Sequence, residues 1–278
     1  MNALSEYLMS DSLINPILDG GYLPHSLIRL GIRRQLSQRL QEIATRSLSE
    51  AYDSKMRYVK LLRERPIAIE TKKANEQHYE ITAFSNSRTQ KEYIDAVAKS
   101  RGFTNLTVIT GDAADYEFEA ATFDRVVSIE MFEHMKNYQL LLEKVSRALM
   151  PGGKLFLHIF CHKDTPYDFE GGWMSEFFFT GGTMPSADLL LYFQSSLSVQ
   201  RQWWVNGQHY AQTCEDWLKT MLRNKDSIWP ALVGTYGEKD VVTWWNRWQI
   251  FYLACAELFK WESGDTWGVT HLLFEKKA

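Results

Sequence analysis

Glutamate and histidine side chains gather directly after one apolar segment of the chain. Residues 124–129 (Asp-Arg-Val-Val-Ser-Ile) have the pattern of a strand buried in a parallel sheet, and Glu130, Glu133 and His134 follow at once. A histidine changes charge near neutral pH, and a neighbouring carboxylate can orient its ring. Such a pair could take a proton from an ammonium substrate and leave a nucleophilic amine. The residues alone equally allow His134 to cap local backbone beside a solvated Glu133.

A β-α-β unit is predicted to position these side chains. Asn137 can cap a helix, Pro151-Gly152-Gly153 can end it, and residues 155–160 form the next apolar strand. One face of that helix carries the apolar residues Leu141, Leu142, Val145, Ala148 and Leu149. In open α/β sheets ligands bind beyond the carboxyl ends of the strands, which is where Glu130 would lie.

Polar side chains also follow two other predicted strands. Asn86 comes shortly after residues 79–84, and Asp112 comes shortly after residues 106–110. A parallel sheet would bring both to the edge that carries Glu130, where amide and carboxylate groups could bind adenosine or ribose. The pattern is weak by itself, because polar residues often end strands.

Composition and motifs exclude several other classes of protein. The 278 residues carry a formal net charge of −3, which gives no electrostatic reason to bind nucleic acid or an anionic membrane. The N-terminus lacks a signal-peptide pattern, and no apolar run is long enough to span a bilayer. Three scattered cysteines predict a reducing, cytoplasmic location with neither a disulfide framework nor a metal site. Phosphate-binding glycine loops, G-x-S-x-G and H-E-x-x-H are all missing.

The rest of the chain is predicted to be helical at its start and mixed at its end. Residues 1–24 look loosely structured, and their breakers are Pro16, Gly20-Gly21 and Pro24. Helices are expected over 25–48, 50–64, 89–102, 188–193, 214–222 and 241–260, and strands over 197–204 and, at a sheet edge, 267–274. The arginines at 29, 33, 34 and 39 are interpreted as solvated surface. All ten tryptophans lie between Trp173 and Trp267; most are expected to pack in the interior and a few to line a pocket.

Several segments together resemble a known family. Residues 82–94 (Thr-Ala-Phe-Ser-Asn-Ser-Arg-Thr-Gln-Lys-Glu-Tyr-Ile) and 128–138 (Ser-Ile-Glu-Met-Phe-Glu-His-Met-Lys-Asn-Tyr) are similar to segments of plant coclaurine N-methyltransferases. Shorter matches follow at 161–163, 182–186 and 191–194. These enzymes belong to the cyclopropane fatty acid synthase family of S-adenosylmethionine-dependent methyltransferases.

The resemblance implies an α/β fold, with the Rossmann-like sheet of class I methyltransferases. It implies a helical appendage over residues 1–66 and a methyltransferase domain over 67–278. Residues 161–278 would form a tryptophan-rich half on the substrate side.

The resemblance also implies roles for individual residues. His134, Glu133 and Glu130 correspond to the base and carboxylates that hold and deprotonate an amine, and Glu80, after Tyr79, to a carboxylate near the substrate ammonium. Cys255 matches an active-site cysteine position of the wider family, although a buried core cysteine is the preferred interpretation, because methyl transfer from a sulfonium needs no covalent intermediate. Positions that would contact the cofactor are Asn86, Gln90, Asp112, Ala113 and Ile129.

One departure from the family pattern has a physical cost. Members carry a strand and a glycine-rich loop between the segments that here are Tyr79-Glu80-Ile81 and Thr82-Ala83-Phe84, so the first βα unit is missing. That strand lies in the middle of the family's sheet, and each backbone group left buried and unpaired costs about 1–3 kcal/mol. We therefore expect weak or absent binding of S-adenosylmethionine.

The function expected from the sequence is methyl transfer from S-adenosylmethionine to a small amine of the coclaurine-like alkaloid class. One alternative is an inactive, truncated homologue that binds partners, and another is alkyl transfer to a lipid double bond. A pocket protein that binds aromatic amines without turnover is the weakest. The expected partner is an amine, with no nucleic acid and no membrane insertion, and a homodimer is left open.

Overall fold

The computed structural model describes residues 11–44, 47–65, 84–102 and 106–277. The chain forms two compact units: residues 1–45, 171–176 and 205–268 make the first, and residues 46–170, 177–204 and 269–278 make the second. The predicted strand over 79–84 lies almost wholly outside the described residues. The predicted boundary between residues 66 and 67 stays a prediction.

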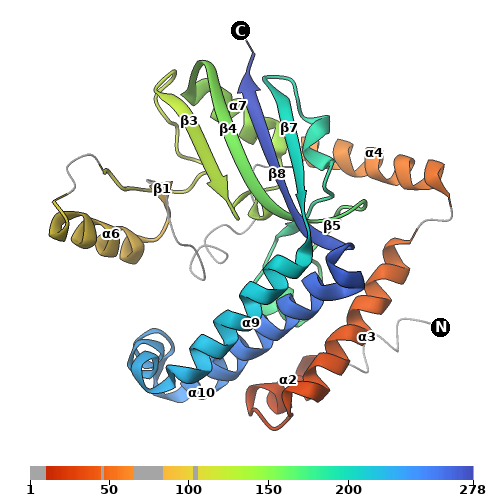
Figure 1. The fold of residues 1–278 in the computed structure, drawn as a ribbon, viewed down its shortest axis with the longest axis vertical. Helices are drawn as coiled ribbons and strands as arrows, with labels where there is room; N and C mark the ends of the chain where they lie inside the picture. The colour runs from red at the N-terminus through yellow and green to blue at the C-terminus, as the bar shows by residue number, and fades with distance from the viewer. Residues whose placement is uncertain (1–10, 45–46, 66–83, 103–105, 278) are drawn as a thin grey trace. The chain divides into compact units, whose positions relative to one another are not determined.

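A four-stranded sheet is the centre of the second unit, with strand order β3-β4-β8-β7 (Figure 1). The strands are β3 (Phe123–Ile129), β4 (Leu149–His162), β8 (Trp267–Lys276) and β7 (Leu197–Val205). β3 and β4 are parallel, with Val126 opposite Leu155, and β8 runs in the opposite direction to β3 (Figure 1). The prediction that residues 267–274 form an edge strand was wrong. β8 lies between β4 and β7, where Leu272 and Phe274 are fully buried.

The predicted β-α-β unit is present as β3, α7 (Tyr138–Ala148) and β4. The Asn137 side chain accepts a hydrogen bond from the backbone N–H of Leu140 at 3.0 Å, so it caps α7 as expected. The predicted turn at residues 151–153 is a bulge inside β4. Phe123 pairs with Leu149 and Arg125 pairs with Lys154, so the residues between Leu149 and Lys154 have no partners in β3.

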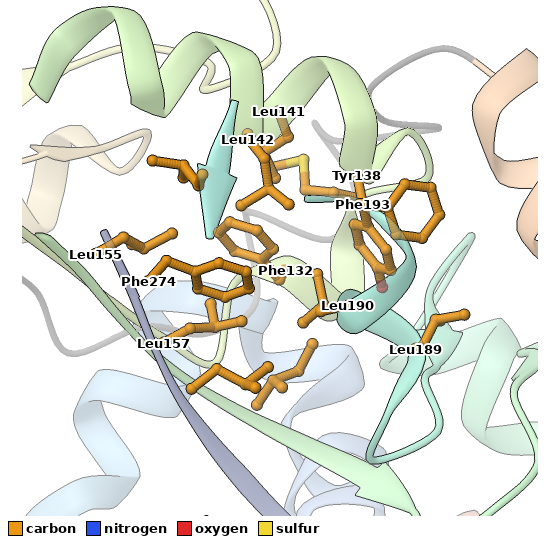
Figure 2. Packing of buried hydrophobic residues seen from close by; sticks show 14 of the residues in the cluster. Phe132, Tyr138, Leu141, Leu142, Leu155, Leu157, Leu189, Leu190, Phe193 and Phe274 are labelled. Atoms are coloured by element: carbon orange, nitrogen blue, oxygen red, sulfur yellow. The ribbon is translucent and has the colours of Figure 1, made fainter. Parts of the chain in front are cut away.

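The main hydrophobic core lies between α7 and the four-stranded sheet. Figure 2 shows Phe132 and Phe274 meeting the leucines of α7 and β4. All of these side chains are almost completely buried, and each leucine or phenylalanine contributes about 1.5–3 kcal/mol by leaving water. The apolar face predicted for α7 from its helical spacing therefore packs in the core, as expected.

A two-stranded sheet forms separately, without hydrogen-bond pairing to the first sheet among the described residues. β1 (Phe84–Ser85) and β2 (Ile109–Thr110) pair in parallel, and α6 (Arg88–Ser100) connects them. Within the described ranges, β3 has hydrogen-bond pairing only with β4. Its apolar residues Val127 and Ile129 are 45% and 52% exposed. This is the arrangement expected of a sheet whose middle strand is missing, because a strand that is normally buried becomes an edge.

One longer helix and several short elements complete the second unit. The helix is α4 (Leu48–Glu64), and the short elements are η1 (Phe132–His134), β5 (Tyr167–Asp168), β6 (Thr183–Met184) and η2 (Leu189–Tyr192). β5 and β6 pair antiparallel, and the helical segment predicted over 188–193 is the short 3-10 helix η2.

The first unit is mostly helical. Its helices are α2 (Asp11–Asp19), α3 (His25–Ile43), α9 (Gly207–Arg223), α10 (Lys225–Lys260) and η3 (Trp261–Gly264), and α8 (Trp173–Phe177) falls largely in it. The prediction of a loose segment over 1–24 was wrong for α2, whose last residue, Asp19, forms an ion pair with Arg247 of α10 at 2.8 Å. α9 starts earlier than predicted because Asn206 caps it, and α10 starts earlier because it continues through a kink at Gly237, where φ is +80°.

Two of the arginines interpreted as solvated surface bind a buried carboxylate. Arg29 and Arg33 each contact Glu257 of α10 at 2.6 Å, and Glu257 is almost completely buried. Their charge therefore ties α3 to α10, which the helical pattern alone did not indicate.

Tryptophans of the first unit pack mainly against other rings. Trp244 stacks on Tyr236 with ring centroids 4.4 Å apart, and Trp229 contacts Trp245. The prediction that most tryptophans pack in the interior was wrong: only Trp245 and Trp267 are buried, and Trp203 and Trp217 are exposed. Throughout the described part of the chain, none of the helices combines the length and the apolar character that crossing a membrane requires.

Hydrogen exchange tests whether β3 is an open edge. We expect backbone amides of β3 to exchange with solvent faster than those of β8, because among the described residues β8 has hydrogen-bonded neighbours on both sides and β3 on only one. Mass spectrometry of peptides covering residues 123–129 and 267–276 measures the difference. Equal protection of the two strands would show that β3 has a second partner.

Candidate active site

Glu133 and His134 are buried together immediately after β3. They lie on η1 and are 1% and 5% exposed. Burial, and then the nearby Glu130 carboxylate, raise the pKa of Glu133 well above its usual value, which favours the neutral acid. The Oε2 atom of Glu133 is buried and has no hydrogen-bond partner within the described residues. A buried, unpartnered carboxyl oxygen of this kind is suited to a ligand that brings a donor.

An aromatic wall lies against the His134 ring. Phe179 stacks on this ring with centroids 5.9 Å apart. The Phe179 ring in turn contacts the rings of Phe169 and Phe160, with centroid separations of 5.3 and 5.8 Å. Phe169 and Phe179 are only half-buried, so part of their faces is accessible. Gly182 makes this packing possible, because a Cβ there would lie 2.8 Å from the Phe169 ring. Aromatic faces attract both apolar rings and cations.

A buried ion-pair network fixes the segment that carries this wall. The Asp168 carboxylate accepts hydrogen bonds from Tyr58 at 2.5 Å, Arg65 at 2.6 Å and Lys136 at 2.7 Å. The Lys136 ammonium also donates to the carbonyl of Gly182 at 2.9 Å and to the hydroxyl of Thr183 at 2.8 Å. Lys136 lies two residues after His134, so the network links η1 to β5 and β6.

The charges of this network are well compensated. Burial alone would raise the pKa of Asp168, but the hydrogen bonds from Lys136, Tyr58 and Arg65 outweigh it and hold the pKa below its usual range. Burial lowers the pKa of Lys136, and its contacts with Asp168 oppose that shift. Burial first, and then the Asp168 charge, raise the pKa of the Tyr58 hydroxyl strongly. A buried pair with this many partners is costly to break.

Glu130 ends β3 in an unusual backbone conformation. Its φ of +51° lies in the left-handed region that non-glycine residues seldom adopt. Its backbone N–H donates to the carbonyl of His158 on β4 at 3.1 Å, and its Oε1 lies 2.9 Å from Nε2 of the same histidine. Two contacts with one residue hold the strained position, as is common at functional sites.

Four of the residues predicted to contact a cofactor follow the two strands of the small sheet. Gln90 accepts a hydrogen bond from the Ser85 hydroxyl at 2.9 Å, and Asn86 directly follows β1. Asp112 accepts from the backbone N–H of Ala114 at 2.8 Å, and the carbonyl of Ala113 accepts from Lys144. Because β1 and β2 are parallel, their carboxyl ends bring these four residues to one edge. Ile129, the fifth, ends β3 in the other sheet.

Three other predicted residues cannot be placed with this group. Tyr79 and Glu80 lie outside the described residues. Cys255 is half-buried on α10 in the first unit, and its role stays a prediction. No local pattern indicated the phenylalanine wall or the Asp168 network, because their members lie up to 110 positions apart.

The fold is the α/β fold of methyltransferases, and comparison with known proteins assigns the family. A model described as mycolic acid cyclopropane synthetase matches residues 69–269, and the chain belongs to this family. It is 40% identical to (S)-coclaurine N-methyltransferase from Papaver somniferum and 37% identical to that from Thalictrum flavum subsp. glaucum, each over 71% of this chain. The matches cover 58% and 56% of those proteins, so the chain spans a little over half the length of these relatives.

Solved structures give the same result. A coclaurine N-methyltransferase bound to N-methylheliamine and SAH superposes with a TM-score of 0.87 at 28% identity, over 95% of this chain and 99% of that chain. The mycolic acid cyclopropane synthase CmaA1, complexed with SAH and CTAB, matches with a TM-score of 0.55 at 20% identity, over 69% of this chain and 68% of that chain, which shows the shared fold.

Removing the ammonium group of Lys136 tests the buried ion-pair network. We expect Lys136→Met to lower the free energy of unfolding by about 2–4 kcal/mol, because Asp168, Gly182 and Thr183 each lose a buried donor. Urea denaturation measures this change. Lys219→Met is the matched control, since that lysine is 62% exposed in a surface ion pair and should cost less than about 1 kcal/mol. Equal losses in the two variants would contradict the structural role of Lys136.

Proposed function

We propose that this chain is an S-adenosylmethionine-dependent N-methyltransferase that acts on a small aromatic amine of the coclaurine-like class. The observation that carries the proposal is the burial of Glu133 and His134, with the His134 ring stacked on the half-buried Phe179. A neutral carboxyl, an imidazole and an aromatic wall together suit a substrate that has an aromatic ring system and a basic nitrogen. The relatives named for coclaurine N-methylation support the same substrate class.

Each of these side chains has a chemical task in this proposal. His134 takes the proton of the substrate ammonium, which gives the nitrogen a lone pair for attack. Phe179 and Phe169 hold the aromatic part of the substrate beside His134. Glu130, whose side chain is 18% exposed where that of Glu133 is almost wholly buried, is the carboxylate suited to stabilise the cationic nitrogen.

The described residues fit only one end of the cofactor. S-adenosylmethionine supplies an activated methyl group on a sulfonium. The half-exposed Ile129 offers apolar surface for an adenine, and Asn86, Gln90 and Asp112 offer amide and carboxylate groups. The sequence carries no glycine-rich loop for the methionine end. We therefore propose that cofactor binding is weak. Glu80, after Tyr79, is proposed to lie near the substrate ammonium, and Cys255 is proposed to be a core cysteine rather than a nucleophile.

A second candidate function rests on the open edge of β3. A strand with Val127 and Ile129 exposed can accept another strand, which suits an inactive homologue that binds a protein partner. Alkyl transfer to a lipid double bond is less favoured, because a double bond has no proton for His134 to remove before attack. A cytoplasmic location is part of the proposal and is supported by three cysteines that are all free thiols.

An amine methylation assay tests the proposed function. We expect the purified chain to transfer labelled methyl from S-adenosylmethionine to coclaurine, with a high KM for the cofactor. His134→Ala should lower kcat by about 10²–10⁴-fold, because the proton acceptor is lost. His209→Ala, which removes an exposed histidine on α9, should leave kcat unchanged.

Two results would contradict the proposal. No transfer at saturating cofactor would favour the inactive binding protein, and equal kcat values for the two histidine variants would exclude His134 as the base. Labelled product from an unsaturated phospholipid in place of the amine would favour the lipid reaction.

A further inference from the structure

Three neighbouring strands contribute one row of titratable side chains to the four-stranded sheet. Glu130 follows β3, His158 lies on β4 and His271 lies on β8. Oε1 of Glu130 is 2.9 Å from Nε2 of His158, and Nδ1 of His158 is 2.9 Å from Nε2 of His271. The row follows the strand order β3-β4-β8, so rigid backbone pairing fixes the spacing of its members.

The chemistry of the groups determines which atoms carry the hydrogens. A carboxylate oxygen can only accept, so the 2.9 Å ion-pair contact of Glu130 Oε1 favours a hydrogen on Nε2 of His158. When His158 is neutral with this hydrogen on Nε2, its Nδ1 is an acceptor and Nε2 of His271 is the donor to it. Each imidazole is thereby held as the Nε2–H tautomer.

Packing keeps His271 in this orientation. Its ring contacts that of Phe156 with centroids 5.3 Å apart, and the two imidazole rings lie 4.9 Å apart. Burial, followed by the neighbouring His158, lowers the pKa of His271, which favours the neutral ring that the donor role needs.

We propose that His158 and His271 are positioning residues that hold the Glu130 carboxylate in the orientation required for the amine cation. This inference rests on the proposed function, because Glu130 matters only if a cationic nitrogen binds beside it. His158 contacts Glu130 directly, and His271 acts through His158. Neither is assigned contact with the substrate.

Two variants of His271 separate positioning from packing. Gln at this position keeps an N–H donor for Nδ1 of His158, whereas Leu keeps only apolar volume. We expect His271→Leu to lower kcat about tenfold, and His271→Gln to stay within about twofold of the unmodified chain. Thermal melts of both variants show whether each is folded.

Nuclear magnetic resonance of the imidazole nitrogens tests the row without requiring turnover. At pH 8 we expect both His158 and His271 to be Nε2–H tautomers, with His158 becoming a mixture of tautomers in Glu130→Ala. His209, which is exposed, serves as the internal reference in the same spectrum.

The outcomes distinguish this proposal from the proposed function. An Nδ1–H tautomer on His158, or no response to Glu130→Ala, overturns the row itself. The expected tautomers with equal kcat in His271→Leu and His271→Gln overturn positioning by His271. If the tautomers are as expected but the chain transfers no methyl group, the row of side chains is supported. The proposed function is then excluded, and so is the catalytic role that we assign to the row.

Discussion

The parallel pairing of β3 with β4 determines where the candidate catalytic side chains lie. The register places Ile129 opposite His158, so the chain leaves β3 at Glu130 beside a histidine that can hold it. The same exit point starts η1, where Phe132 enters the hydrophobic core and leaves Glu133 and His134 buried beneath the phenylalanine wall. Every proposed step of the chemistry depends on this one strand pair. Its stability comes largely from the leucines of α7 and β4 that pack beneath it (Figure 2).

Buried charge adds a second constraint. Lys136 and Asp168 are expensive to remove from water, and the structure offsets that cost with Tyr58, Arg65 and Thr183 rather than with solvent. The network joins η1, β5, β6 and α4, which come from four separate stretches of the chain. The aromatic wall and the Glu133–His134 pair are thus held by polar contacts on one side and by the apolar core on the other.

Local signals in the sequence predicted the elements that depend on neighbouring residues. The Asn137 cap, the apolar face of α7 and the strand over residues 124–129 each depend on a few positions, and all three were confirmed. The predicted burial of that strand was wrong, because Val127 and Ile129 of β3 are 45% and 52% exposed. Features that depend on distant pairing were missed. The interior position of β8, the contact of Arg29 and Arg33 with Glu257, and the helix α2 all need partners from more than 60 positions away. The residues of the candidate site also divide into those with a local signal in the sequence and those that depend on distant pairing. Glu130, Glu133 and His134 were found from their place after a strand, whereas the Phe179 wall, Asp168 and His271 gave no local signal.

Within the described residues, the lack of hydrogen-bond pairing between β3 and the two-stranded sheet is the physical weakness of this chain. Insertion of a relative's first βα unit between Ile81 and Thr82, followed by calorimetric titration with S-adenosylhomocysteine, measures its effect most directly. We predict that the repaired chain binds the ligand at least tenfold more tightly than the chain as it stands and melts at a higher temperature, because β3 regains its second neighbour. Equal affinity and equal melting temperature in the two chains would contradict the conclusion that the missing strand and loop limit cofactor binding.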